Sequence, residues 1–371
     1  MPTWIIVLLA IVLALIIITV AYLRLNPQFG GRITPALWER YAKSPQWNNS
    51  AFENQIHTVV GGFGLKAMMD TLRMMHKNRK VRRPAEPLTI RPFDSQAWQA
   101  NPELPKVIWY GHSVGLLQLG GKNFLIDPML GPDAAPVSPV GGVKRFSANT
   151  LDLIDSLPPL EAVLLSHDHY DHLDYASIKR LKPKVNRWLV ALGVGRHLES
   201  WGIPTEQITE LDWWDEIQMG DLTLAFTPSR HFTGRGTADR QKSLWGGFVF
   251  LSPKHRIFWS GDGGEGPHFE EIGKKYGPFD WGFMECGQYN MAWHDIHMMP
   301  DEVVTAAKQA DVKVAFPVHW AGFALSPHAW TEPAELFVAQ AEAQQQDHCI
   351  PKLGQVVTLG QEPAVEAWWQ A

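Results

Sequence analysis

Cysteine is almost absent from this chain, and an excess of basic charge is absent altogether. Only two of the 371 residues are cysteine, Cys286 and Cys349. Two are too few for a disulfide framework, so we expect both to be reduced and buried. The formal net charge of −5 gives no electrostatic footprint for nucleic acid. No short repeat or low-complexity tract is present, and with 45% apolar residues the chain can bury a large core.

Long apolar runs are missing except at the N-terminus. Residues 4–23 form an uncharged, strongly apolar run, which as a helix spans roughly 30 Å, the thickness of a bilayer core. A cleaved signal peptide is the alternative. However, no Lys or Arg precedes the run, and no small-residue cleavage site follows it. We therefore expect residues 1–25 to be an uncleaved transmembrane anchor.

Basic residues follow the anchor at Arg24, Arg32, Arg40 and Lys43. The positive-inside rule then predicts a single-pass protein of a bacterial-type inner membrane with its remaining residues in the cytoplasm. A periplasmic domain is the alternative.

Residues 26–87 are expected to form a juxtamembrane connector. Within it, Leu65, Met68, Met69, Leu72 and Met75 make a helical stripe, and a basic segment follows over residues 76–83. Such a helix either lies on anionic lipid or docks on its own domain with a solvated basic end. We favour docking.

From residue 88 to 371 the sequence changes to short apolar runs separated by Gly, Pro and Asp. This texture predicts a domain of the α/β (α+β) class, with sheets covered by helices. We expect strands over 106–110, 115–119, 123–128, 162–166, 188–192, 222–227, 246–251, 256–260 and 312–317, and helices over 147–157, 175–181 and 301–310.

The densest group of polar residues follows the predicted strand over 162–166. His167-Asp168-His169-Tyr170-Asp171-His172 places three imidazoles and two carboxylates in six residues, and both groups are ligands for zinc and similar divalent ions. His231, Asp262 and His319 each follow a later apolar run, where a strand would lead into a loop. A metal site of this kind indicates a hydrolase.

The His-x-His-x-Asp-His motif with a spaced His, Asp and His resembles the metallo-β-lactamase fold superfamily over roughly residues 100–350. The resemblance implies a four-layer αββα sandwich with two metal ions at one edge of the sheets. The implied ligands are His167, His169 and His231 for one ion, Asp171, His172 and His319 for the other, and Asp262 as a bridge. We expect zinc, and iron or manganese fits the same ligands.

Two ions roughly 3.5–4 Å apart can share a hydroxide, because metal binding lowers the pKa of water to about 7. The resemblance therefore gives catalytic roles to Asp171 and Asp262. All seven ligand positions are filled, which argues against a degenerate pseudoenzyme. Asp168 is not matched to a ligand and would orient a histidine ring instead.

Four other segments resemble the N-acyl-phosphatidylethanolamine phospholipase D branch of that superfamily: 26–31, 109–113, 127–128 and 297–300. The resemblance places His297 near the active site, as an aid to proton transfer or phosphate binding. A histidine at a helix entry is the alternative. For His112 we favour a turn cap over a catalytic role. Residues 288–293 lack the arginine-bearing loop associated with animal members, which leaves the headgroup preference open.

The leading hypothesis is a membrane-anchored, dinuclear, metal-dependent phosphodiesterase. It would hydrolyse an N-acyl-phosphatidylethanolamine-type phospholipid by a phospholipase D reaction, with a metal-bridging hydroxide as nucleophile. The alternatives are a tethered hydrolase of a soluble sugar-phosphate lactone, and a metal-bearing membrane scaffold without turnover. RNA processing is disfavoured by the acidity and the anchor. The expected partners are a phospholipid or small phosphoester and the membrane, without nucleic acid; the oligomeric state stays open.

Overall fold

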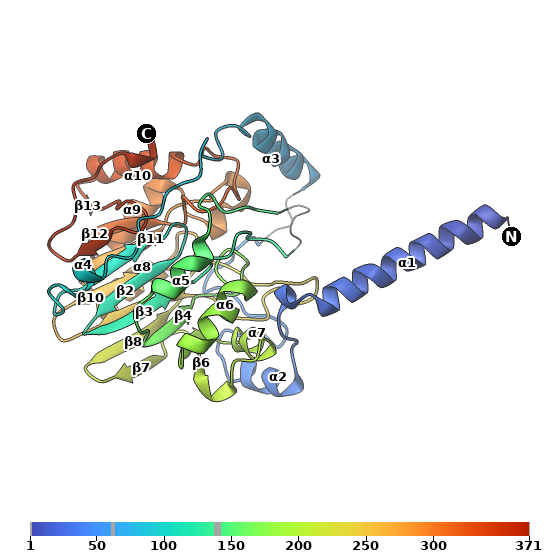
Figure 1. Cartoon of the computed structure of the whole chain (residues 1–371), viewed down its shortest axis with the longest axis horizontal. Coiled ribbons are helices and arrows are strands. Elements are labelled where there is room, and N and C mark those ends of the chain that lie inside the picture. Colours follow the sequence, from blue (N-terminus) through green and yellow to red (C-terminus); the bar gives the residue numbers. More distant parts are fainter. Residues whose placement is uncertain (1, 61–63, 137–141, 371) are drawn as a thin grey trace.

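A computed structural model describes residues 2–60, 64–136 and 142–370 of the chain. Its centre is a pair of seven-stranded sheets. Helices α5, α6 and α7 lie beside the first sheet, and α8, α9 and α10 beside the second (Figure 1). The layers therefore run helix, sheet, sheet, helix, which confirms the predicted four-layer αββα sandwich.

The first sheet has the strand order β14-β1-β2-β3-β4-β5-β6. Its strands β1, β2 and β3 are antiparallel, and β3 to β6 are parallel. The strands are β1 (Lys106–Trp109), β2 (Gly115–Leu119), β3 (Lys122–Ile126), β4 (Ala162–Leu165), β5 (Trp188–Ala191), β6 (Ile208–Leu211) and β14 (Val356–Thr358). The helices beside it are α5 (Leu153–Ser156), α6 (Tyr175–Leu181) and α7 (Gly195–Ser200). The single helix predicted over 147–157 is wrong, because Asn149 is left-handed at φ 55° and a 3-10 turn over Thr150–Asp152 precedes α5.

The second sheet has the order β13-β12-β11-β10-β9-β8-β7. Strands β7 to β10 are antiparallel, and β10 to β13 are parallel. They are β7 (Glu216–Met219), β8 (Leu222–Thr227), β9 (Gly247–Leu251), β10 (Arg256–Trp259), β11 (Phe279–Glu285), β12 (Val312–Val318) and β13 (Asp347–His348). Its helices are α8 (His268–Tyr276), α9 (Pro300–Gln309) and α10 (Glu332–Ala343).

The two sheets place polar residues at the carboxyl ends of parallel strands. Asp127 directly follows β3, and the segment 167–172 follows β4. In the second sheet, Glu285 ends β11 and His319 directly follows β12. Strand pairs that run in the same direction end at the same edge, so the topology gathers these residues at one edge of the sandwich.

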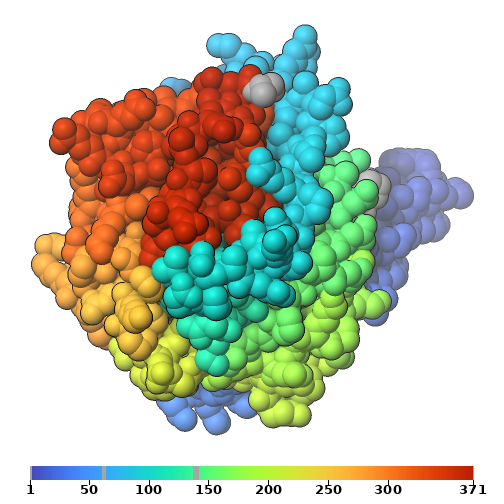
Figure 2. All heavy atoms as spheres, turned by 60° about the vertical axis from the view of Figure 1, so that its left-hand side comes forward, coloured from blue at the N-terminus to red at the C-terminus, as the bar shows by residue number. Residues whose placement is uncertain are grey.

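The C-terminal segment supplies the outer strand of the first sheet, next to β1. Strand β14 pairs antiparallel with β1, and the Arg91 amide donates to the carbonyl of Leu353 at 2.9 Å. Figure 2 shows this face, where the last part of the chain (red) lies against the cyan segment that leads into β1. Cys286 and Cys349 are free and buried, as expected.

Helix α1 (Thr3–Leu25) projects away from the sandwich (Figure 1). None of its residues is buried, and it is long and apolar enough to cross a membrane. The next segment returns to the domain: α2 (Pro35–Tyr41) is followed by Phe52, and Tyr41 and Phe52 are both fully buried in the core. The domain boundaries at residues 25 and 87 stay predictions.

Helix α3 (Leu65–Lys77) forms where the apolar stripe predicted it. None of its residues is buried. The expectation that this stripe docks on the domain is therefore wrong, because Leu65, Met68, Met69 and Leu72 are exposed and only Met75 is half-buried.

Candidate metal centre

Three histidines from two loops bring one ring nitrogen each to the same point. Nδ1 of His169 lies 3.0 Å from Nε2 of His167 and 3.2 Å from Nε2 of His231. Metal–nitrogen bonds of about 2.0–2.1 Å in a tetrahedron place ligand nitrogens about 3.3 Å apart. The spacing of this cluster therefore fits three nitrogens around one ion.

The hydrogen bonds of the outer ring nitrogens of His167 and His231 determine that their inner nitrogens carry no proton. Nδ1 of His231 donates to the carbonyl of Ile296 at 3.0 Å. The Ser166 hydroxyl donates to Asp127 and so accepts from Nδ1 of His167 at 2.9 Å. Burial holds the pKa of both His167 and His231 well below the usual value. Both rings are therefore neutral, with a lone pair on the inward Nε2, the form that binds metal.

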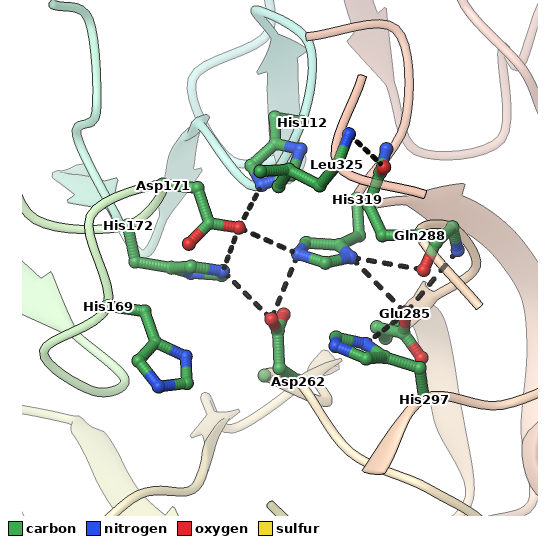
Figure 3. A network of polar contacts seen from close by, with 12 residues as sticks. His112, His169, Asp171, His172, Asp262, Glu285, Gln288, His297, His319 and Leu325 are labelled. Carbon is green, nitrogen blue, oxygen red and sulfur yellow. Dashed lines mark hydrogen bonds and ion pairs between the residues drawn. The ribbon is translucent and has the colours of Figure 1, made fainter. Parts of the chain in front are cut away.

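A second group of acceptors converges beside the first (Figure 3). Oδ2 of Asp262 lies 3.0 Å from Nε2 of His172 and 2.9 Å from Nε2 of His319. Oδ2 of Asp171 lies 3.4 Å from the same nitrogen of His319. Asp262 also approaches the first group, at 4.0 Å from Nε2 of both His167 and His231. It is thus the one carboxylate of the predicted set that lies between the two groups.

Outer acceptors leave the inward nitrogens of the second group without protons when the two rings are neutral. Asp127 accepts from Nδ1 of His172 at 2.9 Å. Nδ1 of His319 donates to the carbonyl of Gly287 at 3.3 Å and lies 3.2 Å from Glu285. When these rings are neutral, lone pairs on Nε2 face the Asp262 carboxylate at hydrogen-bond distance. Nε2 of His319 is buried and makes no hydrogen bond of good geometry. Such a convergence of acceptors calls for positive charge.

The pKa values of His172 and His319 also indicate that the second group favours a positive charge. Burial lowers the pKa of His172, but the carboxylates of Asp262, Asp127 and Asp171 outweigh it and raise the value to about 10. Burial likewise opposes the charge on His319, and the Asp262 and Asp171 carboxylates raise its pKa well above the usual range. A divalent ion would supply this charge in place of protons, and the imidazole and carboxylate ligands suit zinc, iron or manganese.

Three neighbours of the site were missed as functional residues by the sequence. Asp127 and Glu285 orient the rings of His172 and His319. His112 is buried in a turn at φ 53°, and its Nε2 lies 2.8 Å from Oδ2 of Asp171. The expected turn is present at His112, but the ring also orients the Asp171 carboxylate. Asp127 and Glu285 each stand at the end of an apolar run, the same signal that marks His231, Asp262 and His319.

Asp168 lies directly behind the cluster and orients a histidine outside it. Its carboxylate accepts from the Ser243 hydroxyl at 2.7 Å and from the Gly234 amide at 2.9 Å. Nε2 of His197 lies 3.2 Å away. The predicted orienting role is therefore directed at His197, which the sequence did not single out.

The comparisons with known proteins agree with this geometry. Residues 122–320 match the family model described as a beta-lactamase superfamily domain. The chain belongs to this superfamily. An uncharacterized protein of Mycobacterium bovis is 35% identical over 332 residues, covering 88% of each chain. The N-acyl-phosphatidylethanolamine-hydrolyzing phospholipase D 1 of Caenorhabditis elegans is 33% identical over 225 residues, or 57% of this chain and 62% of the relative.

Solved structures support the fold of the superfamily. An isothiocyanate hydrolase from Delia radicum gut bacteria has a TM-score of 0.54 and 21% identity, and the match covers 68% of this chain and 99% of the hydrolase. This likeness concerns the fold alone. The family match and the clustered histidines and carboxylates identify a metal-dependent hydrolase of the metallo-β-lactamase superfamily.

In this member of the superfamily, the two groups of nitrogen and carboxylate atoms open into a pocket of about 280 Å³. Its polar lining includes Asp171, Asp262, His297 and His319, and its apolar walls are Phe232, Trp293, Ile296 and Leu325. No lysine or arginine lines it within the described residues. The residues that line the pocket therefore include no arginine, and the sequence of residues 288–293 contains none either.

The structure places His297 on the wall of this pocket, as the resemblance implied. Its ring stacks on His319 with centroids 5.3 Å apart, and its Nδ1 lies 3.1 Å from Oε1 of Glu285. His297 is outside α9, because Met299 is the N-cap residue of that helix. Its role in the reaction stays a prediction.

Proposed function

We propose that the chain is a membrane-anchored, dinuclear, metal-dependent phosphodiesterase. Its substrate would be a phospholipid of the N-acyl-phosphatidylethanolamine type, cleaved at the phospholipase D position. One observation carries the proposal: two adjoining sets of bare acceptors meet at Asp262 beneath an apolar-walled pocket. A relative named as a phospholipase D for this lipid supports the substrate class.

The proposed ligands keep the roles that the sequence suggested. His167, His169 and His231 would hold one ion, and Asp262 would bridge it to a second ion held by Asp171, His172 and His319. When bound, two such ions supply an activated water and neutralise the charge of a phosphodiester. Zinc is the ion we expect.

The remaining polar residues act on the ligands and the substrate. Asp127 and Glu285 keep Nε2 of His172 and His319 bare, and His112 orients Asp171. Nδ1 of His297 faces Glu285, so the opposite nitrogen of its ring is the one offered to the substrate. From the wall of the pocket it would pass a proton to the leaving alkoxide or bind the phosphate.

The size of the pocket favours a substrate that enters only in part. Ligand pockets usually measure about 300–1,000 Å³, and this one, at 280 Å³, is just below that range. It has room for a phosphodiester and the start of its substituents, while the acyl chains would stay in the bilayer. A long apolar helix in the same chain, α1, fits this arrangement.

The catalytic domain would face the cytoplasm. Arg24 in the last turn of α1 and the basic residues that follow support this orientation under the positive-inside rule. Fusion of green fluorescent protein and alkaline phosphatase to the C-terminus tests it: fluorescence without phosphatase activity supports a cytoplasmic domain, and the reverse places it in the periplasm.

The substrate is tested with the purified full-length protein in mixed micelles of N-acyl-phosphatidylethanolamine. In water enriched in ¹⁸O, attack at phosphorus gives phosphatidate with one ¹⁸O and N-acylethanolamine with none, as read by mass spectrometry. Asp262→Ala should give neither product. A protein that opens a phosphorylated sugar lactone but leaves the lipid intact would refute the lipid assignment, and a fully metallated protein inert to both would indicate a scaffold.

A further inference from the structure

Helix α3 exposes an apolar stripe that no other part of residues 2–60, 64–136 and 142–370 covers. Leu65 is 72% exposed and Leu72 is 53% exposed, and Met68, Met69 and Met74 are also exposed. At 100° per residue, Leu65, Met68, Met69 and Leu72 share one face of the helix. Contiguous exposed apolar faces mark interaction sites for membranes or other proteins.

The neighbouring face of α3 is mainly basic. Lys66, Arg73 and Lys77 project there, with Asp70 as the single acid of the helix. Asp70 pairs with Arg73 at 3.0 Å, and the basic segment continues through Arg79 and Lys80. An apolar stripe beside a basic face is typical of helices that lie in the interface of an anionic bilayer.

The two flanks of α3 are tied to the two loops that wall the candidate site. Before the helix, the Val59 amide donates to Asp295 at 2.8 Å, next to Ile296 of the pocket. After it, the Arg82 guanidinium donates to the carbonyl of Ser326 at 2.7 Å, next to Leu325 of the pocket. The helix is therefore held beside the mouth of the site. It also stands out from the body toward the end from which α1 leaves (Figure 1).

We propose that α3 lies in the surface of an anionic bilayer and holds the mouth of the active site against it. The apolar stripe would enter the boundary of the acyl chains, and Lys66, Arg73 and Lys77 would meet lipid phosphates. This inference rests on the proposed anchoring of α1 in the same bilayer, but not on which ester the site hydrolyses. Charge complementarity and the shared side with α1 favour lipid over a protein partner.

The test uses single introduced cysteines as dye sites, since Cys286 and Cys349 are fully buried. Met69→Cys reports α3, Ile16→Cys reports α1, and Leu336→Cys on α10 is a matched exposed apolar control. Each full-length variant is labelled with an environment-sensitive dye and reconstituted in nanodiscs of phosphatidylglycerol and phosphatidylethanolamine. Some of the lipids carry a nitroxide on the acyl chain to quench nearby dyes.

The expected result is strong quenching and a blue shift at positions 16 and 69, with neither at position 336. The triple variant Lys66→Glu, Arg73→Glu and Lys77→Glu should weaken quenching at position 69 several-fold and leave position 16 unchanged. Quenching at 16 without quenching at 69 overturns the α3 proposal and spares the anchor. Quenching at 69 alone overturns the anchor and supports α3.

Two other occupants of the stripe give distinct signals. If α3 folds onto the pocket as a lid, the dye at position 69 shifts to the blue but lipid nitroxides do not quench it. If α3 pairs with a second copy, the shift depends on the number of chains in each nanodisc. Either result overturns the membrane proposal.

Discussion

Nε2 of His172 lies 3.0 Å from Oδ2 of Asp262, although neither atom carries a proton while the ring is neutral. The ring's single N–H, on Nδ1, is committed to Asp127 at 2.9 Å. Two acceptors at this distance repel each other unless a cation lies between them. The side chain that accepts from Nδ1 therefore decides whether His172 can serve as a ligand at all.

Asp127→Asn is expected to lower metal affinity and activity about 10–100-fold, the usual effect of losing a partner behind a ligand. The Ser166 amide donates to Oδ1 of Asp127 at 2.8 Å, so the amide oxygen of the new side chain should take that position and its NH₂ group the position of Oδ2. The NH₂ group would then face the Nδ1–H of His172, and the ring would have to move its proton to Nε2. Metal content after dialysis measures the effect.

Ser166→Ala is the matched control for this prediction. It removes the hydroxyl that donates to Oδ2 of Asp127 at 2.7 Å and accepts from Nδ1 of His167 at 2.9 Å, but it leaves the carboxylate opposite His172. We expect a smaller loss of metal than for Asp127→Asn. Equal losses in the two variants would show that the tautomer of His172 matters no more for binding than the contact of Ser166 with His167.

His297→Ala is expected to lower kcat about 10²–10⁴-fold, the range for a lost general acid or base, with metal content unchanged. The ring lines the pocket and is absent from the proposed ligand set. His294→Ala is the control, because His294 is a nearby histidine that pairs with Glu302 at 2.8 Å. Steady-state kinetics with parallel metal analysis is measured for both variants. Loss of metal in His297→Ala would show that His297 is a ligand.

The sequence predicted which histidines and carboxylates lie together because each of them follows a recognisable strand. The runs before His231 and His319 are short, apolar and bounded by loop residues, so both the strands and the residues after them could be located. The contacts that give those residues their protonation states were not predictable. Glu285 reaches His319 only because β11 and β12 pair in parallel, ending together at Glu285 and Val318.

Strand β11 shows why part of the fold was missed. Its seven residues are nearly all buried, yet they include Asp280, Gly282 and Glu285, which break the apolar pattern. Gly282 is needed there because a Cβ would lie 2.6 Å from Val312 of β12. Exposure of α3 also escaped prediction, since an amphipathic pattern does not reveal which surface its apolar face meets.

Gly31→Ala is expected to destabilise the protein by about 1–3 kcal/mol, as overpacking does. A Cβ at Gly31 would lie 2.0 Å from the carbonyl oxygen of Arg196. The same residue donates its amide to Nδ1 of His197 at 3.1 Å, and that ring bonds Asp168 behind the metal cluster. The midpoint of thermal unfolding in detergent should fall accordingly.

Gly64→Ala is the control for crowding, since a Cβ at Gly64 meets nothing within 4 Å. Its effect should stay within about 0.5 kcal/mol, as for an exposed site away from the core. If Gly31→Ala unfolds at the wild-type midpoint, the segment after α1 does not depend on this close approach.

Asp262→Ala and Asp171→Ala should differ in how many ions they lose. Oδ2 of Asp262 approaches both groups, at 2.9 Å from His319 and 4.0 Å from His231, whereas Asp171 approaches only the second. Wild-type protein should hold two ions per chain, Asp171→Ala about one, and Asp262→Ala fewer than one, as measured by inductively coupled plasma mass spectrometry. Each set of three histidine or carboxylate ligands can bind an ion by itself only while its geometry is held. The metal lost from Asp262→Ala should therefore not return when metal is added at micromolar concentration. Equal occupancy in the two variants would show that Asp262 does not bridge, and the two groups would then be independent sites.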